Sequence, residues 1–403
     1  MSTMLEAAEQ SALRGLLGAL ESTSRPHAVD SHWERALWAA PRHAFLPDRI
    51  YVGDRLESCL RSVAPAHWLR AAYTDAPVVT QVNDGAEIGP DQERWPSSSS
   101  SVPSMVLRML RMLELCPGHS VLEIGTGTGW NTGLLAHYLG SSNVTTVEVD
   151  AALAARAVTN LKGVGLTPTV VCADGAAGVP GRAPYDRIVA TCSVRRVPRA
   201  WLHQTREGGL ILTPWESPWL CFGLLRMTVD RDGGACGRFH PHASFMLMRG
   251  QRTDLRIYRD VVQDDHAPEE SGTDLSPWAV TGDDWAAQFA IGLQLRDVWH
   301  AWHDRPVVDG IASRLWLATT DATSWAAVDW DGHSHERFTV WQHGPRRLWA
   351  EVEAAYRWWR GAGRPGPGRF GMTITPDGTH KPWLDRPDRK VPVSGGAPPV
   401  WSR

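Results

Sequence analysis

Short apolar runs alternate with stretches of helical periodicity through the middle of the chain. The apolar runs predict strands at 120–124, 144–150, 168–174, 185–192 and 208–214. The periodic stretches between them predict helices at 130–139, 151–163 and 198–205. Such alternation is typical of an α/β fold with a mostly parallel sheet and right-handed crossovers. Ligands of such sheets bind at the carboxyl ends of the strands, so chemistry is expected there.

The segment before residue 120 gives a less regular pattern. Residues 1 to about 60 are expected to be helical, with an amphipathic stretch at 1–20, a break at 24–26 and an irregular turn at 41–48. Mostly loop is expected at 61–104, followed by a helix at 104–115. The pair Pro117-Gly118 is a firm stop for that last helix.

The pattern changes again after about residue 250. The expected elements are helices at 283–303 and 346–360 and strands at 313–320, 324–330, 337–343 and 369–375. Asp-Gly pairs at 331–332 and 377–378 are hairpin turn signals. We therefore predict two domains, residues 1–250 and 251–403, the second a small α+β domain. The acidic stretch 263–272 is expected to be a linker or exposed loop, and residues 394–399 a loose tail.

A glycine-rich sequence follows the first central strand. Residues 121–129 read Val-Leu-Glu-Ile-Gly-Thr-Gly-Thr-Gly, and a helix is expected from Trp130. Glycine allows the backbone to turn tightly and to approach a ligand closely. The next strand ends in Glu148, where a carboxylate can accept hydrogen bonds from both hydroxyls of a ribose. The pattern indicates a cofactor that contains adenosine; the alternative is a glycine-rich turn in an ordinary α/β domain.

The details of the motif favour a cationic cofactor over a dinucleotide. A dinucleotide site has G-x-G-x-x-G and holds a pyrophosphate at a helix N-terminus, whereas this chain has G-x-G-x-G preceded by Glu123. An acid there repels phosphate but suits the ammonium and sulfonium of S-adenosylmethionine. A third strand ends in Asp174-Gly175, and this carboxylate can accept a hydrogen bond from the adenine amino group.

Composition narrows the partners. The 403-residue chain has a formal net charge of −3, which gives no basic excess for nucleic acid or an anionic membrane. No apolar run reaches the roughly 18 residues that a membrane-spanning helix needs, and residues 1–20 do not read as a signal peptide. The six cysteines are scattered without a C-x-x-C pair, which fits a reducing, cytoplasmic location.

Several of these motifs, in this order, resemble the protein-L-isoaspartate O-methyltransferase family. The resemblance runs from Pro41 to about Pro214. It includes Pro-Arg-His-Ala-Phe-Leu-Pro-Asp at 41–48, Tyr-Thr-Asp-Ala-Pro at 73–77, Leu-Cys-Pro-Gly at 115–118, the glycine motif, Val-Glu at 147–148, Ala-Asp-Gly at 173–175 and Tyr-Asp-Arg-Ile at 185–188. It implies a Rossmann-like S-adenosylmethionine-dependent methyltransferase with a helical N-terminal region.

The resemblance also implies roles for individual residues. The residues that would surround the amino-acid part and ribose of the cofactor are Gly125, Thr126, Gly127, Thr128 and Gly129. Glu148 would hold the ribose, and Asp174 with Gly175 would meet the adenine. A serine that the family places beside the methyl group and the substrate carboxylate matches Ser101, which precedes Val102-Pro103.

Two features depart from the family's repair enzymes. Trp-Pro-Ser-Ser-Ser-Ser-Ser at 95–101 replaces their Gly-x-Gly-Gln-Thr-Ile-Ser, and the chain continues for well over a hundred residues after the catalytic domain. Together these features resemble a subgroup associated with ribosomally made, post-translationally modified peptides of the lanthipeptide or graspetide type. That subgroup methylates an aspartate of an already cyclised peptide, and the ester then collapses to an aspartimide.

The serine run has two interpretations. Such runs usually form flexible linkers. A carboxylate is already ionised at neutral pH and needs orientation rather than a base for methyl transfer. Hydroxyls of Ser98, Ser99, Ser100 and Ser101 could orient it without adding a fixed charge, and because the family's serine falls on Ser101 we favour this catalytic role.

Other candidates have weaker signals. His300 and His303 would share one helix face but lack a matching third ligand, so no metal site is expected. Arg195 and Arg196 are either solvated charge or, for Arg195 at a strand end, a substrate contact. The C-terminal part holds 13 of the 21 tryptophans, which either fill a small core or form a peptide-binding face. The helical spacing of Leu348, Val352, Ala355, Tyr356 and Trp359 indicates that many of this region's aromatic residues are core.

The leading hypothesis is therefore an aspartyl O-methyltransferase that acts on a modified peptide. The alternatives are isoaspartyl repair of damaged proteins, a small-molecule carboxyl methyltransferase and a non-catalytic scaffold that binds cofactor or peptide. The intact glycine motif with Glu148 and Asp174 argues against the scaffold. A small-molecule substrate does not explain the large C-terminal part.

Overall fold

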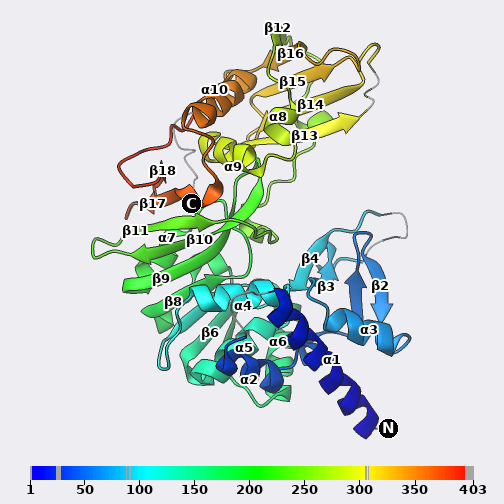
Figure 1. Ribbon diagram of the computed structural model, residues 1–403, viewed down its shortest axis with the longest axis vertical. Coiled ribbons are helices and arrows are strands. Elements are labelled where there is room, and N and C mark those ends of the chain that lie inside the picture. Colours follow the sequence, from blue (N-terminus) through cyan, green and yellow to red (C-terminus); the bar gives the residue numbers. More distant parts are fainter. Residues whose placement is uncertain are drawn as a thin grey trace.

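The structure is a computed structural model that describes residues 2–23, 29–87, 89, 92–304, 306 and 308–394. Within these residues the strands form three sheets (Figure 1). The main sheet lies in the middle of the molecule, and the two smaller sheets are built from residues before and after its central strands. Met1, the break predicted at 24–26 and residues 395–399 of the predicted tail lie outside the described residues.

The main sheet confirms the predicted α/β fold. Among the described residues its strands are, in spatial order, β18 (His380–Leu384), β17 (Phe370–Ile374), β11 (Ala235–His240), β10 (Cys221–Val229), β9 (Thr205–Glu216), β8 (Tyr185–Ala190), β5 (Val121–Ile124), β6 (Val144–Glu148) and β7 (Thr169–Cys172). The strands from β9 to β7 run parallel, and those from β10 to β18 are antiparallel to their neighbours. Helices α5 (Trp130–Leu139) and α6 (Ala151–Gly163) match their predicted bounds.

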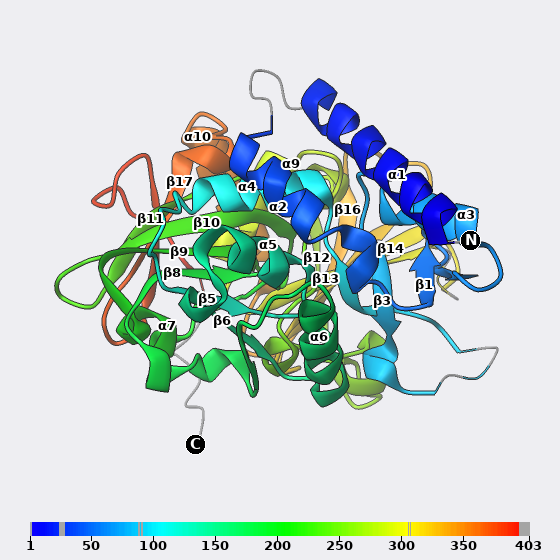
Figure 2. The same cartoon turned by 90° about the horizontal axis from the view of Figure 1, so that it is seen from below.

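Both faces of the parallel strands are covered, which explains their continuous apolar runs. Successive residues point to opposite faces, so Val121 and Leu122 belong to two different apolar clusters. One cluster joins the sheet to α1 (Ser2–Thr23), α2 (Ser31–Ala39), α4 (Pro103–Met112) and α5, and Figure 2 shows α2, α4 and α5 gathered on that side. The other joins it to α7 (Arg199–Gln204), α9 (Trp285–Gln294) and α10 (Leu348–Gly361).

The segment between α2 and α4 differs from the predicted helix and loop. It folds into a second antiparallel sheet, whose strands in spatial order are β2 (Glu57–Leu60), β1 (Arg49–Val52), β3 (Val78–Val82) and β4 (Pro96–Ser100). Helix α3 (Pro65–Ala72) and the short helices η1 (Arg42–Phe45) and η2 (Asn83–Gly85) connect them. The prediction of loop at 61–104 was wrong because polar residues and short strands give little apolar alternation.

The C-terminal part contains the expected antiparallel sheet. Its strands in spatial order are β12 (Glu269–Thr273), β16 (Phe338–His343), β15 (Trp325–Trp330), β14 (Ser313–Thr319) and β13 (Val298–Asp304), with α8 (Trp278–Thr281), α9 and α10 beside them. The helix predicted at 283–303 ends at Gln294, and the rest is β13. The stretch predicted as a linker at 263–272 contributes an exposed edge strand, β12.

The last two strands leave this C-terminal sheet altogether. Strand β17 pairs with β11, so residues 370–384 extend the main sheet instead of completing the small domain to which the sequence pattern assigned 369–375. The predicted domain boundary at residue 250 stays a prediction, although the pairing of β17 with β11 joins strands from its two sides. Among the described residues, no helix is both long and apolar enough to cross a membrane.

Candidate active site

The glycine-rich loop sits at the carboxyl end of β5, where the sequence placed it. Gly125, Gly127 and Gly129 all have positive φ, at 93°, 55° and 95°. Residues with a side chain rarely adopt a positive φ, so the loop requires glycine at these positions. A Cβ at Gly125 would also lie 2.9 Å from the hydroxyl oxygen of Thr191. The amides of Gly125 and Thr126 donate to the carbonyl of Val147, which fastens the loop to β6.

A narrow cavity of about 110 Å³ opens beside this loop. Of the residues predicted to bind cofactor, Gly125, Gly127, Glu148, Asp174 and Gly175 line it. The other three loop residues do not line it: Thr126 pairs with Thr146 at 2.7 Å, Thr128 accepts from Asn160 through its carbonyl, and Gly129 precedes α5.

Glu148 is the main charged group of this narrow cavity. It is buried at the end of β6, and its carboxylate accepts the amide of Gly127 at 2.8 Å and that of Asp150 at 3.1 Å. Burial raises the pKa of Glu148, and these two amides oppose the rise. Asp174 accepts the amide of Ala176 at 2.9 Å with one oxygen. Two carboxylates and the apolar side chains of Ile124, Val149 and Leu153 suit a nucleoside with ribose and amino donors.

Glu123 lies behind the loop rather than in the narrow cavity. It is fully buried, and its carboxylate accepts from Asn131 at 2.7 Å, from Thr146 at 2.7 Å and from the Thr132 hydroxyl. These bonds link β5, β6 and the first turn of α5. The structure therefore points to Glu123 as a residue that positions the loop, while its predicted contact with cofactor stays a prediction.

The serine run is a strand, so its interpretation as a flexible linker was wrong. Strand β4 pairs antiparallel with β3, and Ser97, Ser98 and Ser100 are buried. Ser98 and Ser99 line the narrow cavity, and a Cβ at Gly127 would lie 3.6 Å from the Ser98 hydroxyl oxygen. The fold thus brings the predicted catalytic and cofactor-binding segments together. Hydroxyls of Ser99 and Ser101 form no hydrogen bond with another described residue.

Arg42 holds this strand in place, and sequence analysis missed it. Its guanidinium is buried and donates to the Ser100 hydroxyl at 2.9 Å and to five described backbone carbonyls, those of Ala72, Thr74, Ala76, Ser100 and Ser101, at 2.8–3.2 Å. It also lies over the ring of Trp130, 5.2 Å from its centroid. Burial lowers the pKa of Arg42 to about 9. One side chain therefore connects η1, the segment after α3 and the end of β4.

A wide cavity of about 1280 Å³ adjoins the narrow one. Five residues line both: Ser99, Thr191, Met246, Leu247 and Arg252. Ser101, Arg195 and Glu216 line only the wide cavity. Because the lining is shared, a group held at Ser99 and Thr191 can face the narrow cavity while the rest of its molecule occupies the wide one.

Residues 246–252, here termed the strap, cover the narrow cavity. The amide of Ser193 donates to the Met246 carbonyl and the amide of Met248 to the Ser193 carbonyl, which fixes one end. At the other end, Arg249 contacts Asp84 at 2.9 Å, Gln81 at 3.0 Å and Asp150 at 3.2 Å. The strap, η2 and the start of α6 are thereby tied together along the narrow cavity.

The prediction that His300 and His303 share one helix face was wrong. Both lie on β13, and residues three apart on a strand point to opposite faces. His300 contacts the Trp219 carbonyl at 3.1 Å, and His303 contacts the Tyr258 hydroxyl at 3.0 Å. Across the part of the chain that the structure describes, no group of three or more His, Cys, Asp or Glu is arranged to hold a metal ion.

Comparison with known proteins identifies one family. Residues 43–223 match the family model described as protein-L-isoaspartate(D-aspartate) O-methyltransferase. A protein-L-isoaspartate O-methyltransferase of Methanosarcina mazei is 35% identical over 231 residues, which are 57% of this chain and 81% of the relative. One of Pyrococcus horikoshii is 29% identical over 54% of this chain and 84% of the relative.

A solved structure with the same family name covers more of the chain. It aligns with 93% of this chain and 99% of its own, at a TM-score of 0.53 and 20% identity. The likeness concerns the fold alone, but it extends past the catalytic domain. The long continuation, predicted above to set this chain apart from the repair enzymes, therefore has a counterpart in the fold of that structure.

Proposed function

We propose that this chain, which belongs to the protein-L-isoaspartate O-methyltransferase family, methylates an aspartyl side-chain carboxylate in a macrocyclised ribosomal peptide. The family makes it an S-adenosylmethionine-dependent carboxyl O-methyltransferase. The peptide substrate is our proposal. In this proposal the methyl ester then closes to an aspartimide.

The observation that carries the proposal is the wide cavity and its junction with the narrow one. Its volume of about 1280 Å³ is above the roughly 300–1,000 Å³ of typical small-molecule sites, so it suits a bulky peptide better than a metabolite. Ser99 and Thr191 line both cavities, and the Thr191 hydroxyl donates to the carbonyl of Gly125 at this junction. A carboxylate on a folded peptide can reach this junction while its ring stays in the wide cavity.

The C-terminal part also contributes to that wall. Thr253, Asp254 and Arg256 line the wide cavity, and Trp285 of α9 stacks on Phe222, another lining residue, with ring centroids 5.4 Å apart. Trp285 is half exposed. Trp316, Trp325, Trp349 and Trp359 are instead buried, so these four tryptophans fill cores. We propose that residues 251–403 help to recognise the peptide through this face.

In this proposal one set of residues binds the cofactor and another set orients the substrate carboxylate. When bound, S-adenosylmethionine supplies an electrophilic methyl group. Glu148 and Asp174 would hold its adenosine, with Gly125 and Gly127 allowing close backbone approach. Ser101 and Ser99 would orient the substrate carboxylate, which is already ionised and needs no base. The strap and the buried strand β4 exclude water, and fixed geometry supplies much of the rate.

Aspartimide formation then follows from the ester's own chemistry. The amide nitrogen of the next residue attacks the ester carbon, its proton leaves with the methoxy group as methanol, and a five-membered imide remains. Relative to the starting peptide, the product has lost one water. A ring-constrained peptide retains the imide longer than a flexible one, which is why the cyclised substrate is the distinctive part of the proposal.

Mass spectrometry with S-adenosylmethionine tests the proposal on three peptides: a linear isoaspartyl peptide, a lactam-bridged peptide with one aspartate, and the same bridged peptide with asparagine there. We expect a gain of one methyl followed by net loss of water on the bridged aspartyl peptide only. The relatives' names favour isoaspartyl repair as the second candidate. Methylation of the linear isoaspartyl peptide alone would establish repair and overturn the proposal.

Replacement of Ser101 by alanine is expected to lower kcat by about 100-fold, because the substrate carboxylate loses an orienting donor. Affinity for S-adenosylhomocysteine should stay within about twofold, since Ser101 lines only the wide cavity. Steady-state kinetics and calorimetry measure the two effects. Ser58→Ala, on the exposed strand β2 of the same sheet, is the matched control. A kcat within threefold of the wild-type value would remove Ser101 from the catalytic set.

A further inference from the structure

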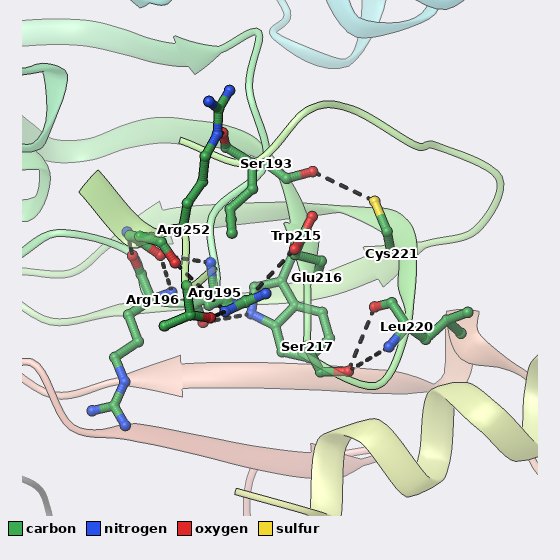
Figure 3. Close-up of polar contacts among 12 residues, drawn as sticks. Ser193, Arg195, Arg196, Trp215, Glu216, Ser217, Leu220, Cys221 and Arg252 are labelled. Carbon is green, nitrogen blue, oxygen red and sulfur yellow. Dashed lines mark hydrogen bonds and ion pairs between the residues drawn. The ribbon is translucent and has the colours of Figure 1, made fainter. Parts of the chain in front are cut away.

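The side chains of Arg195 and Glu216 lie together in the wall of the wide cavity. Arg195 follows β8 and Glu216 ends β9, so both stand at carboxyl ends of parallel strands. Figure 3 shows them side by side, whereas the neighbouring Arg196 points away from the pair. The contact between the Arg195 Nε and a Glu216 oxygen is 3.6 Å long. Only 10% of the Glu216 side chain is exposed.

The protein does not use all the hydrogen-bond donors of Arg195 in this ion pair. The Nε of Arg195 is buried and has no hydrogen-bond partner among the described residues. Its Nη1 donates to Thr253 at 3.1 Å, and its backbone amide to Gln251 at 2.8 Å, so the side chain is anchored without using all of its donors. The buried Nε faces Glu216, so the donor left for a ligand is Nη2, which forms no hydrogen bond with a described residue.

A structural ion pair elsewhere in the chain looks different. Arg314 and Asp329 join β14 to β15 through two short contacts, 2.5 Å and 2.7 Å, in the expected bidentate arrangement. Their side chains are 13% and 3% exposed, and they fasten two strands. Arg195 and Glu216 instead meet at one long contact and both line the wide cavity. The comparison indicates that their free capacity is directed to a ligand.

The chemistry of the pair specifies that ligand. A guanidinium can only donate hydrogen bonds and a carboxylate can only accept them, whereas a peptide unit offers one carbonyl acceptor and one N–H donor. We propose that Arg195 and Glu216 form a specificity subsite for a peptide unit next to the methyl-accepting residue, with Arg195 donating to its carbonyl and Glu216 accepting its N–H. This inference rests on the proposed peptide substrate.

Position within the wide cavity supports this role. Arg195 lies four residues after Thr191, which lines both cavities, and Arg252 lines both cavities from the strap. A peptide whose carboxylate reaches the junction therefore extends its main chain past this pair. Burial raises the pKa of Glu216, and the Arg195 charge opposes the rise.

Binding to protein loaded with S-adenosylhomocysteine tests the subsite separately from methyl transfer. The probes are the lactam-bridged aspartyl peptide and two ester analogues, in which an oxygen replaces the amide N–H just before or just after the aspartate. For the wild-type protein, we expect one ester analogue to bind about tenfold more weakly than the amide peptide, because a site built to accept an N–H rejects the analogue that lacks it.

Variants then assign the loss to Glu216. In Glu216→Met the amide peptide and that ester analogue should bind equally weakly, and Glu216→Gln, which keeps one acceptor oxygen, should restore part of the preference. Arg195→Met should weaken both peptides by about tenfold, and Arg196→Met is the matched control without effect. Affinity for S-adenosylhomocysteine and thermal midpoints verify that each variant is folded.

Three outcomes would overturn the subsite: no preference for the amide in the wild type, a preference that persists in Glu216→Met, or no binding of either peptide. Failure of the proposed function is distinguishable from these. If the bridged peptide binds with the expected amide preference but gains no methyl, the subsite stands and the assigned methylation substrate is wrong.

Discussion

Replacement of Arg42 by methionine is expected to lower the free energy of unfolding by about 4 kcal/mol. The substitution leaves five backbone carbonyls and the Ser100 hydroxyl without the donor that joins them. Each buried acceptor left unpaired costs about 1–3 kcal/mol, and partial relaxation and entry of water reduce the total. Methionine keeps most of the volume, so the loss reports the hydrogen bonds rather than a cavity.

Urea unfolding followed by intrinsic fluorescence measures this loss. Arg70→Met is the matched control, because Arg70 is an exposed arginine on α3, close in sequence to the segment that Arg42 holds. It should change stability by less than about 0.5 kcal/mol. A loss below about 1 kcal/mol for Arg42→Met would contradict the view that this side chain fixes the end of β4.

Replacement of Glu148 by alanine is expected to weaken S-adenosylhomocysteine binding by about 100-fold, or about 2.7 kcal/mol. We expect its carboxylate to accept both ribose hydroxyls, and hydrogen bonds to a charged group contribute about 1.5–3 kcal/mol each. It also holds the amide of Gly127 at 2.8 Å, so the loop loses an anchor as well. Calorimetry measures the effect, with Glu57→Ala on an exposed position of β2 as control. Affinity within threefold of wild type would exclude Glu148 from the cofactor site.

The same carboxylate predicts a pH dependence. Burial raises the pKa of Glu148, so it takes up a proton at a higher pH than an exposed glutamate does. The protonated form is a weaker acceptor. Wild-type affinity for S-adenosylhomocysteine should therefore fall as the pH is lowered through this raised pKa, and Glu148→Ala should lose that dependence. A Glu148→Ala protein with the wild-type pH profile would assign the titration to another group.

The parallel core could be predicted from sequence because its strands are buried on both faces. Strands 121–124 and 144–148 are buried along their whole length, even at Glu123, Thr145, Thr146 and Glu148. Asp150 caps α6 through the amides of Ala152 and Leu153. Glu148, Asp174, Gly125 and Gly127 stand at the ends of predictable strands and all line the narrow cavity, while their contact with cofactor stays a prediction. The local sequence pattern is therefore enough to predict which residues stand at the carboxyl ends of the parallel strands.

The remaining features depend on contacts between distant segments. Strand β4 is a run of serines, and only its pairing with β3 and the bonds from Arg42 make it a strand. Nothing local marks Arg42, a single basic residue in a turn. The two cavities and the strap require the tertiary fold, and so do the hydrogen bonds from Asn131, Thr132 and Thr146 that hold Glu123 behind the loop.

The return of β17 to the main sheet also has a consequence for the order of synthesis. Between His240, the end of β11, and Phe370, the start of β17, lie the 129 residues 241–369. At about 5–20 residues per second, a ribosome needs roughly 6–26 s to cross that interval. Throughout this time β11 is an unpaired edge, the kind of strand that invites pairing with another nascent chain. We therefore expect slow codons or chaperone capture between these strands to change the yield of folded protein.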